Sequence, residues 1–183
     1  MSLQKAKEFA EISHAGQKRK HGNRPYIYHP ECVALYLEEK SYSGNIVAAA
    51  WLHDTVEDCP GVTYNILCRE FGPDIARLVS EVSHPFLRED YSRSERWKIY
   101  LEHYEKASDE GQTLKLADRY CNLKEYLDFW DDVPNRDRKF LNTVYLSESV
   151  DLLDNLSLAD SDVSNDLLYM INDLDELCSE SDL

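Results

Sequence analysis

The sequence lacks the features that mark membrane and secreted proteins. No apolar run approaches the ~20 residues that a membrane-spanning helix needs, and no signal peptide opens the chain. The five cysteines show no metal-type pairing and are odd in number, so we expect free thiols in a reducing cytosol. These absences predict a cytoplasmic protein that does not interact with a membrane.

Positive charge is scarce as well. The chain has 20 Lys and Arg against 35 Asp and Glu, a formal net charge of -15. We expect no binding to nucleic acid, because contacts to a phosphate backbone need a basic surface. Residues 151–183 contain no Lys or Arg, whereas Lys18, Arg19, Lys20 and Arg24 lie together in one irregular segment. A local basic loop can still hold a small anion, so the charge pattern favours a small nucleotide over a polyanion.

Long alternating strand patterns are also absent, and apolar residues recur at helical spacing along nearly the whole chain. The length suits one domain, so we predict an all-α fold with a single domain over residues 1–183. The expected helices cover residues 3–14, 30–40, 44–58, 63–71, 73–83, 92–107, 111–130, 137–156 and 163–178.

The most informative segment is Trp-Leu-His-Asp-Thr-Val-Glu-Asp, residues 51–58, which follows an apolar run. On one continuous helix, His53 and Glu57 are one turn apart, as are Asp54 and Asp58, so all four side chains reach the same side. Carboxylates that converge beside an apolar core repel one another unless a cation lies among them. The segment therefore predicts a metal site.

Two further ligands are available elsewhere in the sequence. His29 precedes Pro30, a residue favoured at the first position of a helix, and Asp118 lies in a segment with a buried helical face. A set of two histidines and two aspartates suits manganese, iron, magnesium or a catalytic zinc better than a structural zinc. Such an open shell leaves room for water and a substrate oxygen, as metal-assisted hydrolysis requires. The predicted ligands are His29, His53, Asp54 and Asp118.

Three segments carry a family resemblance: Pro-Tyr-Ile-x-His-Pro at 25–30, His-Asp-Thr-Val-Glu-Asp at 53–58 and Lys-Leu-Ala-Asp-x-x-x-Asn at 115–122. Together they resemble the HD phosphohydrolase superfamily, in particular the hydrolase domain of RelA/SpoT homologues and the stand-alone small alarmone hydrolases. The resemblance covers about residues 4–150 and leaves 151–183 as an acidic C-terminal helical extension. It implies an HD-domain helical fold.

The resemblance also implies an activity. The expected enzyme is a Mn²⁺-dependent guanosine 3′,5′-bis(diphosphate) 3′-pyrophosphohydrolase of the stringent response. It would convert the alarmones ppGpp or pppGpp to GDP or GTP and pyrophosphate. Glu57 and Asp58, close to the metal without being ligands, would orient and deprotonate the attacking water.

Substrate contacts are expected from a first basic segment around Lys18, Arg19 and Lys20 and from a second one with Arg93 and Arg96. They are also expected from Asn122 and Tyr145, which match positions of the family. From composition alone the first basic segment is equally well a solubilising loop, and the second an exposed helix face with Glu–Arg pairing. The predicted substrate-binding residues are Lys18, Arg19, Lys20, Arg93, Arg96, Asn122 and Tyr145.

Two other functions stay open on the sequence alone. The same metal site would serve hydrolysis of another nucleotide or of a phosphorylated dinucleotide. Alternatively, the chain binds metal and nucleotide without turnover, and its acidic tail docks a protein partner. In this tail, apolar residues recur at helical spacing: Val163, Leu167, Met170, Leu174 and Leu177. This pattern is more typical of a final helix that packs on the domain than of a helix that binds a partner. The sequence also leaves open whether the chain forms a homo-oligomer.

Overall fold

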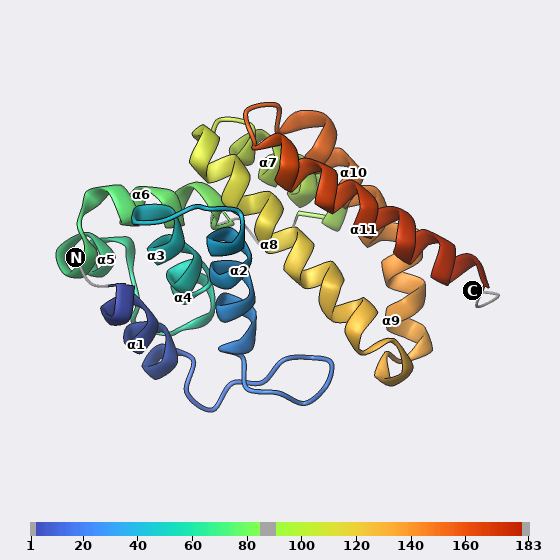
Figure 1. The fold of residues 1–183 in the computed structure, drawn as a ribbon, viewed down its shortest axis with the longest axis horizontal. Coiled ribbons are helices and arrows are strands. Elements are labelled where there is room, and N and C mark those ends of the chain that lie inside the picture. Colours follow the sequence, from blue (N-terminus) through green and yellow to red (C-terminus); the bar gives the residue numbers. More distant parts are fainter. Residues whose placement is uncertain (1–2, 85–90, 181–183) are drawn as a thin grey trace.

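The computed structural model describes residues 3–84 and 91–180, and within these residues the chain is built from helices and connecting loops without a β-strand (Figure 1). The prediction of an all-α fold is confirmed. No helix in the described part of the chain is long and apolar enough to cross a membrane. The helices are α1 (Leu3–Ser13), α2 (Tyr28–Glu39), α3 (Asn45–Leu52), α4 (Thr55–Asp58), α5 (Tyr64–Phe71), α6 (Pro73–Val82), α7 (Arg93–Tyr104), α8 (Asp109–Asp128), η1 (Trp130–Asp132), α9 (Asn135–Phe140), η2 (Leu141–Tyr145), α10 (Leu146–Asn155) and α11 (Ser161–Glu180).

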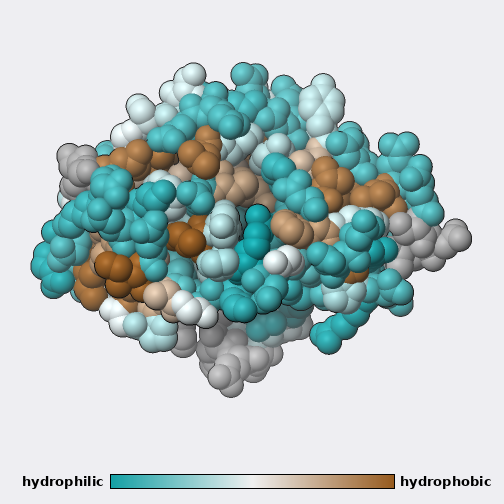
Figure 2. Space-filling view, turned by 60° about the horizontal axis from the view of Figure 1, so that its bottom comes forward, coloured by the Kyte–Doolittle hydropathy of each residue, from teal (hydrophilic) through white to brown (hydrophobic). Residues whose placement is uncertain are grey.

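The long helix α8 lies between the two halves of the molecule. Helices α1 to α6 form one half, and α9 to α11 lie on the other side of α8 (Figure 1). Helix α3 is apolar and buried over almost its whole length, and it packs against α1, α2, α6 and α8. Because α2, α3 and α8 meet in this core, side chains at their ends can converge on one point. The surface seen in Figure 2 is mostly hydrophilic, with hydrophobic side chains gathered in patches.

The expected helix over residues 44–58 is interrupted, which corrects the sequence prediction. Helix α3 ends at Leu52, and α4 starts only at Thr55. Two side chains form hydrogen bonds with backbone carbonyls at the end of α3. Thr55 Oγ1 donates to the Leu52 carbonyl at 2.7 Å, and His53 Nδ1 lies 2.7 Å from the Ala50 carbonyl. Such side-chain bonds compete with helix continuation. The break therefore sets His53 at the junction rather than on a regular helix face.

The predicted helix over residues 137–156 is also divided. Helix α9 is followed by the π-helical turn η2 and only then by α10. A π-turn inserts an extra residue per turn, and such turns are common at functional sites. Tyr145, the last residue of η2, lines the main cavity described below.

Residues 161–180 of the acidic C-terminal segment form α11, which packs lengthwise on α8, whereas residues 151–155 end α10 (Figure 1). Its apolar stripe is buried: Val163, Leu167, Met170, Ile171, Leu174 and Cys178. Of the predicted stripe, Val163, Leu167, Met170 and Leu174 are buried and Leu177 is partly buried, while residues 181–183 of the predicted extension lie outside the described residues. The carboxylate of Asp160 accepts hydrogen bonds from the backbone N–H groups of Asp162 and Val163, which caps the start of this helix.

Candidate active site

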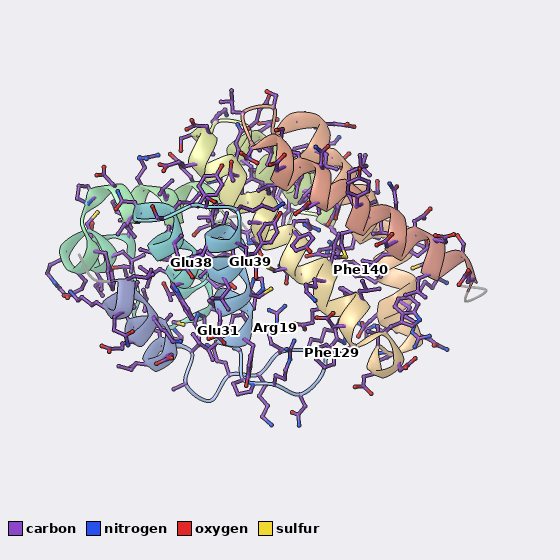
Figure 3. All side chains as sticks on the ribbon, in the orientation of Figure 1. Arg19, Glu31, Glu38, Glu39, Phe129 and Phe140 are labelled. Atoms are coloured by element: carbon purple, nitrogen blue, oxygen red, sulfur yellow. The ribbon has the colours of Figure 1, made fainter. Side chains whose placement is uncertain are left out.

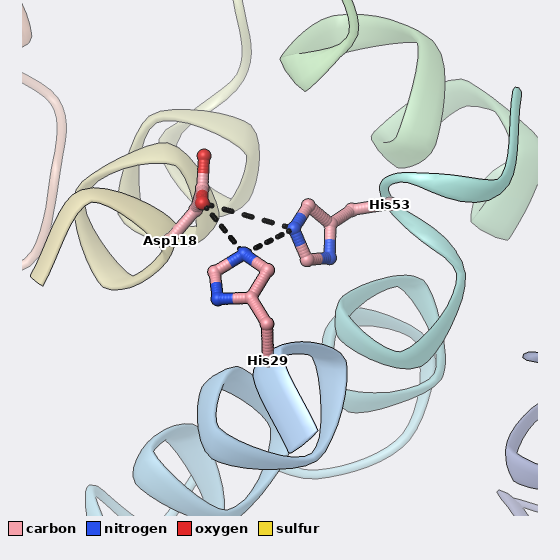
Figure 4. A group of neighbouring side chains, drawn as sticks. All are labelled: His29, His53 and Asp118. Atoms are coloured by element: carbon pink, nitrogen blue, oxygen red, sulfur yellow. Dashed lines mark hydrogen bonds and ion pairs between the residues drawn. The ribbon is translucent and has the colours of Figure 1, made fainter. Parts of the chain in front are cut away.

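Three of the predicted metal ligands converge at the centre of the fold (Figure 4). His29 comes from the first turn of α2, His53 from the junction after α3, and Asp118 from the middle of α8. His29 Nε2 lies 3.1 Å from Asp118 Oδ1 and 3.2 Å from His53 Nε2. All three residues are buried, and their ligand atoms lie within 4.8 Å of one another. They come from three different helical elements, so the core packing of α2, α3 and α8 sets their spacing.

Asp54 reaches the same cluster from the cavity side. Its Oδ2 lies 3.6 Å from His29 Nε2, and its Oδ1 lies 3.2 Å from His53 Nε2. The structure therefore brings all four predicted ligands together. In each histidine the Nε2 atom faces the carboxylates.

The donor set fits a divalent metal ion. Hydrogen bonding of His53 Nδ1 to the Ala50 carbonyl places the proton on Nδ1, so the lone pair of Nε2 is free for a cation. Two imidazole nitrogens and carboxylate oxygens suit manganese, iron, magnesium or catalytic zinc. The chemistry of the site therefore supports a metal without selecting one.

The charges of the cluster also favour a cation. Burial lowers the pKa of His53, but the carboxylates of Asp54 and Asp118 outweigh burial and raise this pKa to about 9. In the absence of metal, a proton on His53 thus supplies positive charge between the carboxylates. A bound divalent cation would displace this proton, because metal ligands must be deprotonated.

Lys115 is a partner of Asp118 that the sequence analysis did not identify. It is buried and donates from Nζ to Asp118 Oδ2 at 2.9 Å and to the Val82 carbonyl at 3.4 Å. Burial opposes ionisation of Asp118, but Lys115 and the two histidines hold its pKa well below the usual range. The three-residue spacing of Lys115 and Asp118 on one helix was the available signal.

Glu57 and Asp58 both face the cavity, despite the break in the helix. Glu57 is held by His84: the backbone N–H of His84 donates to Oε1 at 2.8 Å, and its Nδ1 lies 2.5 Å from Oε2. Asp58 Oδ2 lies 2.7 Å from the hydroxyl of Tyr26, which also lies 2.8 Å from Asp54 Oδ2. The Tyr26 hydroxyl thus connects Asp58 to Asp54, one of the candidate metal ligands. The roles of both acids in water activation stay predictions.

Three of the four candidate ligands, His29, Asp54 and Asp118, line a cavity of about 440 Å³. A second cavity, of about 310 Å³, adjoins it and shares four lining residues. The shared residues are Arg19, Tyr26, Asn122 and Tyr145.

Five of the seven predicted substrate-binding residues line the main cavity: Arg19, Arg93, Arg96, Asn122 and Tyr145. The other two, Lys18 and Lys20, line only the second cavity. Lys18 donates to Asn23 at 2.9 Å, and Lys20 pairs with Asp137 at 2.7 Å. Both side chains already contact neighbouring polar groups, and the role of these two lysines in substrate binding stays a prediction.

The predicted cations differ in how much of their charge is already paired. Arg19 points between α2 and α8 (Figure 3), where it donates to Glu125 at 2.7 Å and to Asn122 at 2.8 Å. Its side chain is 12% exposed. Arg93 forms a bidentate ion pair with Glu148, with hydrogen bonds of 2.9 and 3.1 Å. Arg96 makes no ion pair with any carboxylate in residues 3–84 or 91–180, so its charge is available to a ligand there.

Arg119 is a cavity residue that the sequence analysis did not select. It is buried, yet its guanidinium pairs with no carboxylate in the described part of the chain. The group lies 3.9 Å from the ring centre of Tyr145 and 5.5 Å from that of Trp97, and Nη1 is 3.5 Å from Ser149 Oγ. A buried charge without a partner is unfavourable. Arg119 therefore offers an anion site in the cavity wall.

The family comparison agrees with the fold and the ligand cluster. A family model described as HD domain matches residues 6–145, so this chain belongs to the HD-domain family. The resemblance seen in the three sequence segments is confirmed.

Two named relatives are similar to this chain over about two thirds of its length. A Xenopus tropicalis protein named guanosine-3′,5′-bis(diphosphate) 3′-pyrophosphohydrolase MESH1 is 36% identical over 126 residues, 66% of this chain and 66% of that protein. An Aquifex aeolicus guanosine-3′,5′-bis(diphosphate) 3′-pyrophosphohydrolase is 38% identical over 124 residues, 67% of this chain but 17% of that protein. The matched regions are thus less than two thirds of these relatives' own lengths.

A solved structure matches almost the whole chain. It is described as a metazoan orthologue of SpoT that hydrolyses ppGpp and plays a role in starvation responses. The TM-score is 0.79 at 25% identity, and the match covers 93% of this chain and 94% of that one.

Proposed function

We propose that this chain is a metal-dependent hydrolase that removes the 3′-pyrophosphate from ppGpp or pppGpp to give GDP or GTP and pyrophosphate. One observation carries the proposal: three of the four candidate ligands, two further carboxylates and several arginines line one cavity of about 440 Å³. Hydrolysis of a phosphate ester needs these three elements together. The activities in the names of the relatives support the choice of substrate.

His29, His53, Asp54 and Asp118 would hold the metal, for which we propose Mn²⁺ among the cations that suit these donors. A divalent metal bound here lowers the pKa of water and polarises a phosphoryl oxygen. Lys115 fixes the carboxylate of Asp118 from behind through the bond at 2.9 Å. This support keeps the ligand oriented.

Glu57 and Asp58 would orient the attacking water and accept its proton. Both lie beside Asp54 in the cavity wall, and neither is needed as a ligand. His84 engages both oxygens of Glu57, and Tyr26 engages Asp58. Because both carboxylates are held in place, little rearrangement is required before proton transfer.

The phosphates of the substrate would bind to the arginines whose charge is not already neutralised. Arg96 and Arg119 meet this condition within residues 3–84 and 91–180, whereas Arg93 and Arg19 share theirs with Glu148 and Glu125. Guanidinium groups bind phosphate oxygens through bidentate hydrogen bonds.

The nucleoside would extend into the second cavity. Asn122 and Tyr145 line both cavities and would provide polar and aromatic contacts for a ribose or a base. Lys18 and Lys20 flank this end of the site. In this arrangement the two lysines bind the nucleoside side of the ligand rather than the reacting phosphate.

A nucleotide panel tests the proposal. The purified protein is supplied with Mn²⁺ and with ppGpp, pppGpp, nucleoside monophosphates or a phosphorylated dinucleotide cofactor, and each kcat/KM is measured. We expect the guanosine alarmones to have the highest kcat/KM and a chelator to abolish turnover. A higher kcat/KM for another nucleotide would support the related hydrolase instead. Absence of turnover with every metal and nucleotide would support a binding protein.

A further inference from the structure

Cys32 and Cys121 form a close thiol pair one helical turn beyond two of the metal ligands. Cys32 lies three residues after His29 on α2, and Cys121 lies three residues after Asp118 on α8. The two sulfur atoms are 2.8 Å apart, although the residues are 89 positions apart in the sequence. Because α2 packs against α8, their helix faces hold the two thiols together.

The environment of the pair differs from that of Cys59. Cys59 contacts His14, at 3.4 Å, and no second thiol lies near it among the described residues. Beside the pair, by contrast, is a small cavity of about 50 Å³, whose lining includes both cysteines and the charged residues Arg24, Lys124, Glu125 and Asp128. Cys32 is half-buried and Cys121 is 2% exposed. The pair therefore has one accessible thiol and one protected thiol.

We propose that Cys32 and Cys121 are a dithiol site that a hydroperoxide oxidises to a disulfide. A disulfide has an S–S bond of ~2.05 Å, so the sulfurs need to approach by less than about 1 Å from their present separation. The proposal does not depend on the hydrolase activity, because it rests on the contact between α2 and α8.

The reaction has two steps, with hydrogen peroxide as the oxidant. The Cys32 thiolate attacks one peroxide oxygen, the O–O bond breaks, and Cys32 becomes a sulfenic acid while hydroxide leaves. The Cys121 sulfur then attacks the Cys32 sulfur, the S–O bond breaks, and the hydroxyl group leaves as water with the Cys121 proton. Two electrons pass from the sulfurs to peroxide, which is reduced to two waters.

The surroundings favour Cys32 as the attacking thiol. Its contact with Cys121, supported by Lys124, lowers the pKa of Cys32 even though burial opposes this, whereas burial raises the pKa of Cys121. The thiolate is the nucleophile in such reactions. Cys121 is in place to resolve the sulfenic acid before further oxidation.

A disulfide at this position would connect two distant parts of the chain. It would close a long loop and so restrict the unfolded chain, which stabilises the folded state in the loop-entropy model. It would also tie α2 to α8 next to His29 and Asp118. We therefore expect the oxidised protein to melt at a higher temperature than the reduced protein.

Thiol counting by mass spectrometry tests the site. The reduced, folded protein is treated with a small excess of hydrogen peroxide, unfolded, and labelled with a maleimide. We expect it to lose two of its five reactive thiols, to yield a linked peptide pair containing Cys32 and Cys121, and to regain all labels after dithiothreitol. Retention of all five thiols, or a bridge between other cysteines, would overturn the proposal.

Three variants serve as controls. Cys68→Ser should still lose two thiols and gain melting temperature on oxidation, because Cys68 lies outside the pair. Cys32→Ser should form no internal disulfide and show no gain in melting temperature. Cys121→Ser repeats the test at the buried cysteine. If this substitution impairs folding, the variant at the half-buried Cys32 still decides the test. A disulfide formed in Cys32→Ser would contradict the assignment.

Discussion

His84 holds both carboxylate oxygens of Glu57, with its backbone N–H 2.8 Å from Oε1 and its ring Nδ1 2.5 Å from Oε2. The imidazole is packed on Tyr100, with ring centres 4.2 Å apart. Glu57 is therefore aimed into the cavity by a residue 27 positions later in the chain. In the proposed reaction this makes His84 a positioning residue for the carboxylate that orients water.

We predict that His84→Ala lowers kcat by roughly 10- to 100-fold, because a small displacement of a catalytic group costs this much. KM and metal content should change little, since His84 is not in contact with the ligand cluster. His84→Asn, which retains a side-chain donor, should recover part of the loss. His103→Ala is the matched control, because His103 contacts the Ser80 carbonyl and does not line the cavity. Equal kcat losses in both alanine variants would refute the positioning role.

The Lys115–Asp118 bond predicts that the metal ligands differ in their importance for folding. Asp118→Ala would leave the buried ammonium of Lys115 without its carboxylate, and removing one partner of a buried pair costs about 3–5 kcal/mol. Asp54→Ala should abolish metal retention without this loss, because His53 beside it can give up its extra proton. Urea unfolding and Mn²⁺ content measured on both variants check this. Similar free energies of unfolding for the two variants would show that Lys115 does not depend on Asp118.

Arg119 should contribute directly to substrate affinity. A charge-assisted hydrogen bond is worth about 1.5–3 kcal/mol, so Arg119→Ala should raise KM roughly 10- to 100-fold with a smaller effect on kcat. Arg119→Lys should restore only part of the affinity, because lysine cannot stack on Tyr145 in the same way. Steady-state kinetics with Arg77→Ala as the surface control decides the point, since Arg77 pairs with Glu81. An unchanged KM in Arg119→Ala would remove this residue from the binding site.

The cap of α11 predicts a pH-dependent contribution to stability. Backbone hydrogen bonds lower the pKa of Asp160 in the folded protein, so its contribution is present above its unfolded pKa of about 3.9 and is lost as pH falls through the folded value. Asp160→Ala should cost about 1 kcal/mol at neutral pH. The difference from the unmodified chain should shrink below about pH 4. Urea unfolding at neutral pH and below about pH 4 measures the difference in free energy of unfolding. An equal difference at both pH values would contradict the capping role of Asp160.

The sequence was sufficient to predict the parts of the site that rest on local patterns. Apolar periodicity predicts the helices, and the three motif segments contain the four residues that converge as candidate ligands. The break after Leu52 was missed because it depends on which carbonyl the Thr55 hydroxyl selects. Periodicity alone describes both sides of that junction as helical.

The features that were missed depend on tertiary contacts. His84 reaches Glu57 from a distant position, and Cys32 meets Cys121 across 89 residues. Arg119 lies beside Asp118 in sequence, yet only the packing of Trp97 and Tyr145 shows that it is buried. Long-range contacts of this kind leave no local periodic signal.

Product analysis with ppGpp tests the central claim most directly. The Mn²⁺-loaded protein is incubated with ppGpp, and nucleotide and phosphate products are separated by anion exchange and quantified over time. The account predicts equal amounts of GDP and pyrophosphate, with no orthophosphate, and no products from Asp54→Ala. Orthophosphate as the product, or unchanged turnover in metal-depleted Asp54→Ala, would contradict it.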